Sequence, residues 1–140
     1  MIGTAGKVIA ACMALASQTH DVPSAVLLGI YKTEGGTVGQ QVRNTNGSYD
    51  LGPMQINTIW LSELSEHWGV SKDTAHKWVR DDACTNIGVA AWILRGHLKE
   101  TKSLSQAIAH YHSRTPRHGH RYREKVFSIL QDNDLVRMPR

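Results

Sequence analysis

Two carboxyl groups lie near one another in the sequence, each among neighbours that suit sugar chemistry. Glu34 closes a largely apolar run, and Asp50 lies in the polar, glycine-punctuated segment 46–57, NGSYDLGPMQIN. Two carboxyl groups placed around a sugar are the basic equipment for cleaving a glycosidic bond. Glycan cleavage is therefore the first chemistry that the rest of the chain has to support or exclude.

Glu34 continues the apolar face of the segment that precedes it. It follows Leu27 by seven residues, nearly two helical turns, so it shares a face with Val26, Leu27 and Ile30. It also lies in the last helical turn, where the helix dipole disfavours negative charge. Burial and dipole both favour the protonated form, so we expect a raised pKa and a role as general acid. The alternative is an acid whose side chain reaches solvent at a frayed helix end.

The segment around Asp50 is rich in groups that can bind sugars. Gly52 would let a ligand approach the backbone, and Met54 would offer an adaptable apolar contact for a sugar ring. An aspartate in a turn commonly bonds only to nearby backbone, so composition alone does not separate a sugar site from an ordinary polar loop. Donors and acceptors for hydroxyl and acetamido groups come from Asn44, Asn46, Ser48, Gln55 and Asn57.

The elements that must position these groups are helical almost throughout. Between them, residues 37–57 should be irregular, with a short hairpin possible at Asn46-Gly47. Without repeats or linkers, residues 1–140 are expected to form a single domain. Its fold class is all-α, or α+β with a minimal hairpin, with about six to seven helices. Capping and periodicity place helices over 6–19, 21–34 (Asp21 as cap), 59–68, 71–78 (Ser71 as cap), 84–98, 103–111 (Ser103 and Gln106 as capping box) and 122–130.

The composition is that of a globular protein. The chain has 140 residues, of which 41% are hydrophobic and 20% charged, and a formal net charge of +4. The basic surface suits nucleic acid and an anionic cell wall equally well. No segment is long and apolar enough to span a membrane.

Cys12 and Cys84 are the only cysteines. Cys12 shares a helical stripe with Val8 and Leu15, and Cys84 opens a stripe that runs to Leu98, so both thiols should point inward. Two buried free cysteines and one disulfide between the first and a central helix both remain open.

Residues 8–16, which follow Lys7, resemble a short signal peptide. Cleavage there would remove Cys12 and the apolar face of the first helix. We therefore expect a structural helix, and an export signal is not evident in this sequence.

The histidines form two His-x-His pairs around a turn. His110 and His112 lie two apart on an expected helix and face different ways, and no carboxylate or cysteine set accompanies them. We therefore expect no metal and no other cofactor. A basic surface facing an anionic polymer is the better interpretation of the pairs together with Arg114, Arg117, Arg121 and Arg123.

Several motifs together resemble those of lytic transglycosylases of the soluble-lytic-transglycosylase (SLT) type. Residues 52–57 resemble their Gly-Leu-Met-Gln signature, although Pro53 replaces the usual leucine. Glu34-Gly35 is similar to the Glu-Ser or Glu-Gly pair that carries the catalytic acid. Residues 86–94 resemble the Asn-Ile/Val…Trp-Ile-Leu helix, and residues 109–113 the Ala-x-Tyr motif.

The resemblance runs from about Cys12 to Val126 and implies a lysozyme-like domain with a substrate groove. Residues 43–57 also resemble the active-site loop of animal c-type lysozymes. By resemblance, Glu34 would be the single acid/base that cuts the bond between N-acetylmuramic acid and N-acetylglucosamine and closes a 1,6-anhydro ring. Asp50 would be an auxiliary electrostatic group. Positions matching the groove lining are Gly52, Met54, Gln55, Asn57 and Tyr111, although Tyr111 could equally be packed in the core.

The chain looks most similar to the small specialised transglycosylases of type III and IV secretion, conjugation and pilus systems. That subgroup pairs a first-helix cysteine with one just before the central helix, which implies a Cys12–Cys84 disulfide and a periplasmic setting. Expected partners are peptidoglycan strands and components of such an apparatus, with a monomeric enzyme and no nucleic acid. The alternatives are a hydrolytic lysozyme, such as one of phage origin, and a catalytically silent wall-binding assembly protein. A nucleic-acid-binding domain would not explain residues 52–57.

Overall fold

The computed structural model describes residues 4–113 and 116–133; Arg114 of the predicted basic surface lies outside them. The prediction of a mostly helical fold with a minimal hairpin is confirmed. The elements are α1 (Thr4–His20), α2 (Ser24–Glu34), β1 (Gln41–Arg43), β2 (Tyr49–Leu51), β3 (Ile56–Asn57), the 3₁₀ helix η1 (Thr58–Trp60), α3 (Leu61–Trp68), α4 (Lys72–Asp81), α5 (Ala83–Thr101), α6 (Leu104–His112) and α7 (Pro116–Asp132).

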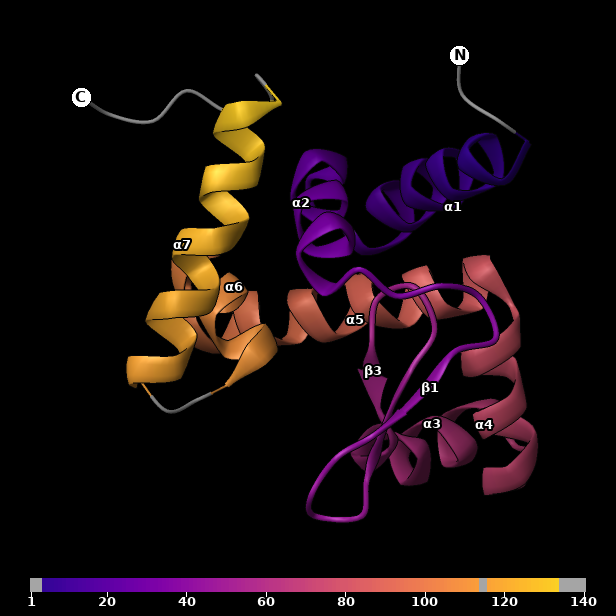
Figure 1. Ribbon diagram of the computed structural model, residues 1–140. Helices are drawn as coiled ribbons and strands as arrows, with labels where there is room; N and C mark the ends of the chain where they lie inside the picture. Colours follow the sequence, from indigo (N-terminus) through magenta and orange to yellow (C-terminus); the bar gives the residue numbers. More distant parts are fainter. Residues whose placement is uncertain (1–3, 114–115, 134–140) are drawn as a thin grey trace.

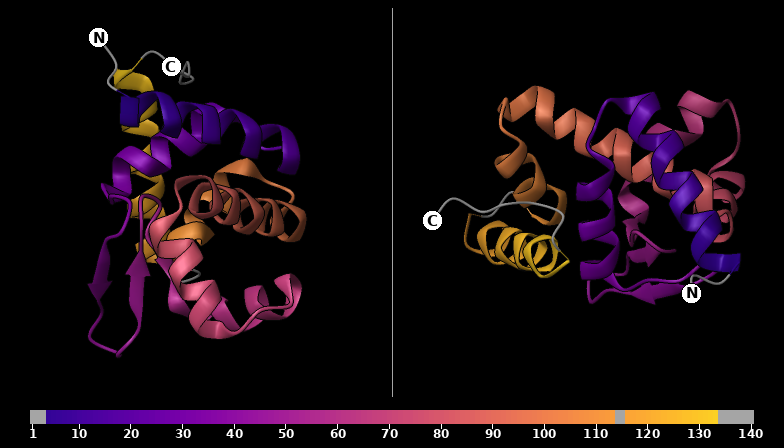
Figure 2. Two further views of the ribbon diagram at one scale, coloured as in Figure 1. Left: turned by 90° about the vertical axis from the view of Figure 1, so that its right-hand side faces the viewer. Right: turned by 90° about the horizontal axis from the view of Figure 1, so that it is seen from above.

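Helix α5 is the centre of the arrangement (Figure 1). It packs against α1, α4 and α6, while α7 packs against α2 and α6. In Figure 1 and in the left view of Figure 2, α5 lies between α1 on one side and the α3–α4 pair on the other. The sheet and α7 stand on opposite sides of the end of α2 (Figure 1). This places the segments on both sides of Glu34 around one opening.

The sheet is a small antiparallel meander in the order β1-β2-β3. Asp50 pairs with Val42 on one side and with Asn57 on the other. The predicted hairpin at Asn46-Gly47 is confirmed: Gly47 has φ +86° and its N–H donates to the carbonyl of Asn44 at 3.1 Å. Only glycine adopts this conformation without strain, so the turn residue fixes the register that presents Asp50.

The helix ends follow the predicted caps with one exception. Ser71 and Ser103 accept hydrogen bonds from the N–H groups of Thr74 and Gln106, and Gly35 ends α2 with φ +67°. The prediction that Asp21 caps α2 is wrong. Asp21 has φ +53° and belongs to the turn after α1, so α2 begins three residues later, behind Pro23, without a side-chain cap.

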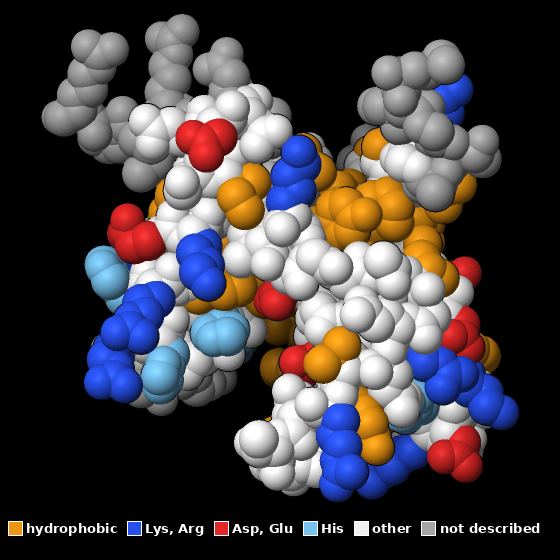
Figure 3. All heavy atoms as spheres, in the orientation of Figure 1, with side chains coloured by type: hydrophobic (Ala, Val, Ile, Leu, Met, Phe, Trp, Pro, Cys, Tyr) orange, Lys and Arg blue, Asp and Glu red, His pale blue; other side chains and the backbone are white. Residues whose placement is uncertain are grey.

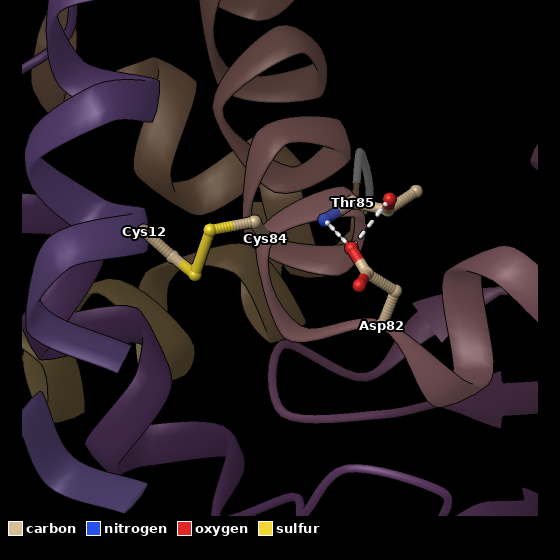
Figure 4. Close-up of a disulfide and its surroundings, with 4 residues drawn as sticks. All are labelled: Cys12, Asp82, Cys84 and Thr85. Atoms are coloured by element: carbon tan, nitrogen blue, oxygen red, sulfur yellow. Dashed lines mark hydrogen bonds between the residues drawn. A yellow bond between two sulfur atoms is a disulfide. The ribbon is translucent and has the colours of Figure 1, made fainter. Parts of the chain in front are cut away.

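A disulfide joins α1 to the start of α5 (Figure 4). Cys12 and Cys84 have Cα atoms 4.7 Å apart and a sulfur–sulfur distance of 2.00 Å, which confirms the pairing. Cys12 is buried, but Cys84 is exposed, so the prediction that both point inward holds for Cys12 alone. Beside Cys84, the Asp82 carboxylate accepts from the N–H of Thr85 at 2.8 Å and caps α5. The two helices are thus joined covalently where the central helix begins.

Two predicted apolar stripes are correct only in part. Leu15 is 59% exposed and Val8 is exposed as well, because α1 turns Cys12, Met13 and Ala16 toward α5 instead. Ile59 is 78% exposed because it lies on η1, outside the helical phase of α3. Across the described residues, no helix combines the length and apolarity that a membrane crossing requires.

Candidate active site

A cleft of about 740 Å³ opens between the sheet and α6. Figure 3 shows this face hollowed near its centre, with acidic side chains at the edge of the hollow. The cleft is lined by most of the residues that the sequence nominated, which are Glu34, Ser48, Asp50, Gln55, Asn57 and Tyr111. Groups from four separate segments of the chain therefore face one space.

Glu34 is the last residue of α2 and is half-buried in the wall of this cleft. Burial raises the pKa of its carboxyl to about 7, and the negative charge of Asp50 also raises it. A hydrogen bond from Tyr122 and the positive charge of Lys125 act in the opposite direction. The raised pKa agrees with the sequence prediction, and burial is its main cause. Near neutral pH this carboxyl group can both hold and release a proton.

Tyr122 is the partner of Glu34 that sequence reasoning missed. Its hydroxyl donates to Oε2 of Glu34 at 3.0 Å, from the buried face of α7. The ring of His112 stacks on it, with centroids 4.8 Å apart and planes 8° from parallel. Burial raises the pKa of Tyr122 well above its ordinary value, so the phenol remains a donor. The sequence placed Tyr122 at the start of the last expected helix, 122–130, and its hydroxyl group was the one signal that it had a polar partner.

Asp50 is held by a side-chain network on the sheet. Asn57 Nδ2 donates to Asp50 Oδ1 and to Ser48 Oγ, each at 3.0 Å. Ser48 Oγ donates in turn to Asn46 Oδ1 at 2.6 Å, and Asn57 Oδ1 accepts from the N–H of Ile59 at 2.9 Å. Because these bonds join β2, β3 and the turn before β2 to one another, the Asp50 carboxylate is oriented before any ligand arrives.

Gly52 and Met54 support the cleft from beneath and do not line it. Met54 is fully buried, so the expectation that it contacts a sugar ring is wrong. Gly52 has φ +68°, and a Cβ there would collide with the side-chain amide of Asn86. The close approach that requires this glycine is therefore internal, and no ligand is needed to explain it.

Asn86 is the buried residue that fixes this loop to α5. Its Nδ2 donates to the carbonyls of Leu51 and Val79 at 2.8 and 2.9 Å, and its Oδ1 accepts from the N–H of Met54 at 2.9 Å. Because a buried polar group without a hydrogen-bond partner costs free energy, these three bonds stabilise the folded position of the Asn86 side chain. Asn86 of the 86–94 motif thus holds in place the loop that carries Gln55.

Tyr111 lies at the cleft, and its hydroxyl is bonded within the protein. Its ring lines the cleft, while its hydroxyl donates to the carbonyl of Met54 at 2.9 Å. Gln55, which also lines the cleft, has φ +52° and donates from Nε2 to the carbonyl of Gly52 at 3.0 Å. Both side chains hold the 52–55 turn in place and face the cleft at the same time.

The far end of the cleft is aromatic. Trp60, His97 and His110 meet edge to face there, with centroids of His97 and His110 5.8 Å apart. His112 lies separately against Tyr122, so the predicted His-x-His pair does divide between two places. Among residues 4–113 and 116–133, no group of three or more histidine, cysteine or acidic side chains is arranged to hold a metal ion.

Comparison with known families gives one match. The model of the transglycosylase SLT domain matches residues 11–127, which include Glu34, the sheet, Asn86, Tyr111 and Tyr122. No curated protein matches the chain significantly.

Proposed function

We propose a residue-level mechanism for this chain, which belongs to the transglycosylase SLT domain family and is therefore a peptidoglycan lytic transglycosylase. In this proposal Glu34 is the single acid/base, acting on the bond between N-acetylmuramic acid and N-acetylglucosamine. The observation that carries the proposal is the half-buried Glu34 carboxyl, with a pKa of about 7, in the wall of the cleft.

In the first step the protonated Glu34 would give its proton to the glycosidic oxygen as the bond to the muramyl C1 breaks. The proton is retained near neutral pH because burial disfavours the carboxylate. Once the carboxylate forms, the hydroxyl of Tyr122 already donates to Oε2, so the new charge has a partner at once. The substrate's acetamido oxygen would stabilise the positive charge at C1.

In the second step the same carboxylate would take the proton of the muramyl C6 hydroxyl. The C6 oxygen then bonds to C1, which closes the 1,6-anhydro ring and returns Glu34 to its protonated form. No water is consumed. A group that must first give and then accept a proton works best with a pKa near the operating pH, which supports Glu34 in both steps.

Asp50 is proposed as an auxiliary group. Its negative charge raises the pKa of Glu34, and its orientation is fixed by Asn57. It would also favour positive charge developing on the sugar between the two carboxyl groups. Ser48, Gln55 and Asn57 are proposed to bind the sugar's hydroxyl and acetamido groups from the sheet side, which their place in the cleft lining supports.

The test of the mechanism is the product released from purified peptidoglycan by the wild type and by Glu34→Gln. Mass spectrometry should find 1,6-anhydromuramyl ends, and Glu34→Gln should release them about 10²–10⁴-fold more slowly. Glu63 is a matched control, because it is an exposed acid that lines the same cleft. Glu63→Gln should retain activity within a few-fold. Equal rates for the wild type and Glu34→Gln would contradict the mechanism.

The second candidate is hydrolysis, as in a lysozyme, and the presence of Asp50 in the same cleft favours it. A second carboxylate is what retaining glycosidases use as nucleophile. The same mass spectra separate the two reactions, because hydrolysis leaves reducing muramyl ends. A silent wall-binding protein would release neither product.

We also propose that the enzyme works in the periplasm, where it opens the wall locally for a secretion, conjugation or pilus apparatus. The Cys12–Cys84 disulfide supports an oxidising compartment. The apparatus is supported by the resemblance of this cysteine pair to that of the specialised enzymes. A chromosomal Glu34→Gln substitution should then reduce the number of assembled structures per cell without slowing growth, and unchanged assembly would contradict the role.

A further inference from the structure

A second, smaller cavity of about 240 Å³ adjoins Glu34 on the α7 side. Glu34 and His112 line both cavities, so the two spaces meet at the carboxyl group. The rest of the second cavity is formed mainly by His118, Arg121 and Lys125 of α7. Figure 3 shows Lys, Arg and His side chains gathered over α7, beside the central hollow. We call this cavity the basic pocket.

In the described part of the chain, the one acid that faces the cations of the basic pocket is Glu34, whose pKa the charge of Lys125 lowers. No ion pair there involves His118, Arg121 or Lys125, and the nearby Glu124 lies 3.9 Å from His120 instead. Arg121 and Lys125 are four residues apart on α7, a spacing at which like charges destabilise a helix slightly. Both are exposed. The arrangement opposes helix stability slightly and leaves positive charge available to an anion.

The charge of the pocket differs from that of the neighbouring cleft. The cleft contains the carboxyl groups of Glu34, Asp50 and Glu63 among polar side chains. Among the described residues that line the basic pocket, Glu34 is the one acid, and with a pKa of about 7 its carboxyl is only partly ionised near neutral pH. An anionic substituent would therefore be repelled by one cavity and attracted by the other.

We propose that the basic pocket binds a carboxylate carried by the muramyl sugar at the cleavage site. This rests on the proposed function, because that function places the muramyl residue beside Glu34. The muramyl sugar carries a lactyl ether, which is a free carboxylate on denuded strands and is extended by a peptide stem with its own carboxylates on mature strands. Its neighbour, N-acetylglucosamine, carries no charge. Arg121 would bind a carboxylate through two parallel N–H bonds, and Lys125 would act as a point charge.

The pocket would then orient the scissile bond. A strand shifted by one sugar would place the neutral N-acetylglucosamine beside Arg121 and Lys125, where no anion would meet them. The same contact would make the enzyme prefer charged over neutralised strands, and the preference would weaken at high salt because the cations are exposed.

The experiment compares kcat/KM on three soluble strands: peptide-bearing, peptide-bearing with all carboxyl groups amidated, and denuded strands with the free lactyl carboxylate. The wild type should prefer a carboxylate-bearing strand over the amidated one by roughly tenfold. Arg121→Gln/Lys125→Gln should reduce that ratio below about twofold. The ratio is the readout because Lys125 also influences the pKa of Glu34, an effect common to all three substrates.

The matched control is Lys72→Gln/Lys77→Gln, which removes the same charge from exposed positions on α4. It should keep the wild-type ratio. A preference for peptide-bearing strands alone identifies the stem as the source of the carboxylate, and an equal preference for denuded strands identifies the lactyl group. Equal wild-type rates on all three strands, or an unchanged ratio in the α7 double variant, would overturn the proposal.

A binding measurement separates this inference from the proposed function. In a Glu34→Gln background, which leaves strands uncut, calorimetry on peptide-bearing and amidated fragments tests the pocket without turnover. If the wild type cuts no strand, the function fails. The inference then stands or falls on whether the binding preference is present and depends on Arg121 and Lys125.

Discussion

The two walls that enclose Glu34 are built in different ways. On the sheet side, Asn57, Ser48 and Asn46 bind one another and Asp50, and Asn86 binds the loop beneath them. On the α6–α7 side, one hydrogen bond from Tyr122 reaches Glu34, and the rings of His112 and Tyr111 stack on Tyr122. The sheet wall is thus a template, because hydrogen bonds fix the positions of its side chains. The α7 wall supplies positively charged side chains.

The two walls also act on Glu34 with opposite sign. After burial, which is the largest influence and raises the pKa, the Tyr122 hydrogen bond lowers it, Asp50 raises it and Lys125 lowers it. The charge on the sheet wall therefore favours the protonated form of Glu34, and the α7 wall favours its carboxylate. The pKa of about 7 results mainly from burial, and the opposing effects of the two walls adjust it.

The largest effect should follow from breaking the support of the sheet wall. Asn86→Ala would leave the buried carbonyls of Leu51 and Val79 and the N–H of Met54 without their partner. We expect the free energy of unfolding to fall by about 3–5 kcal/mol, measured by urea denaturation. Asn133→Ala is the control, because that amide is bonded but exposed, and it should cost less than about 1 kcal/mol. A similar loss in both variants would contradict the template role.

The next effect concerns Glu34 itself, where the walls meet. Its pKa is raised from 4.5 to about 7, so between these values the unfolded chain loses a proton that the folded protein keeps. The wild type should therefore lose up to about 3 kcal/mol of stability as pH rises from 4.5 through 7, and lose no more from this group above it. Glu34→Gln lacks this dependence and should be the more stable protein at pH 8. Parallel stability curves for the two proteins, followed by thermal unfolding from pH 4 to 8, would show that Glu34 is not buried as described.

The two walls also differ in how far the sequence could predict them, because one depends on local contacts and the other on long-range packing. The position of Glu34 follows from helical phase, and the Asn46-Gly47 turn from local chemistry, because each depends on neighbours in sequence. The bond from Tyr122 to Glu34 spans 88 residues and depends on how α7 packs on α2, which no local pattern encodes. The same reasoning covers Met54, whose burial is decided by the long-range bonds of Asn86 and Tyr111 to its backbone. Patterns thus identified the acid and the sheet wall, and packing determined the other wall.

Removing the α7 contact should alter the proton balance of Glu34. Tyr122→Phe deletes the hydrogen bond that lowers the pKa of Glu34, so that pKa should rise above 7. Because the protonated form starts the reaction, the alkaline limb of the pH–rate profile should move to higher pH, with a stability loss of about 1 kcal/mol. Tyr111→Phe is the control, since its hydroxyl binds the carbonyl of Met54 and not Glu34. Its alkaline limb should stay in place, and equal movement in both variants would contradict a specific role for Tyr122.

The smallest effect should come from Asp50, and its sign is opposite. Asp50→Asn removes a negative charge that raises the pKa of Glu34, a weaker influence than the Tyr122 bond, so the alkaline limb should move to lower pH and by less. The oxygen of the new amide can still accept from Asn57, so the sheet network should persist. As an auxiliary group Asp50 should change kcat by less than about tenfold, whereas loss of a nucleophile would cost several orders of magnitude. In Tyr122→Phe/Asp50→Asn the two movements should partly cancel. A limb in the double variant that lies outside the range set by the two single variants would show that the walls do not act on Glu34 independently.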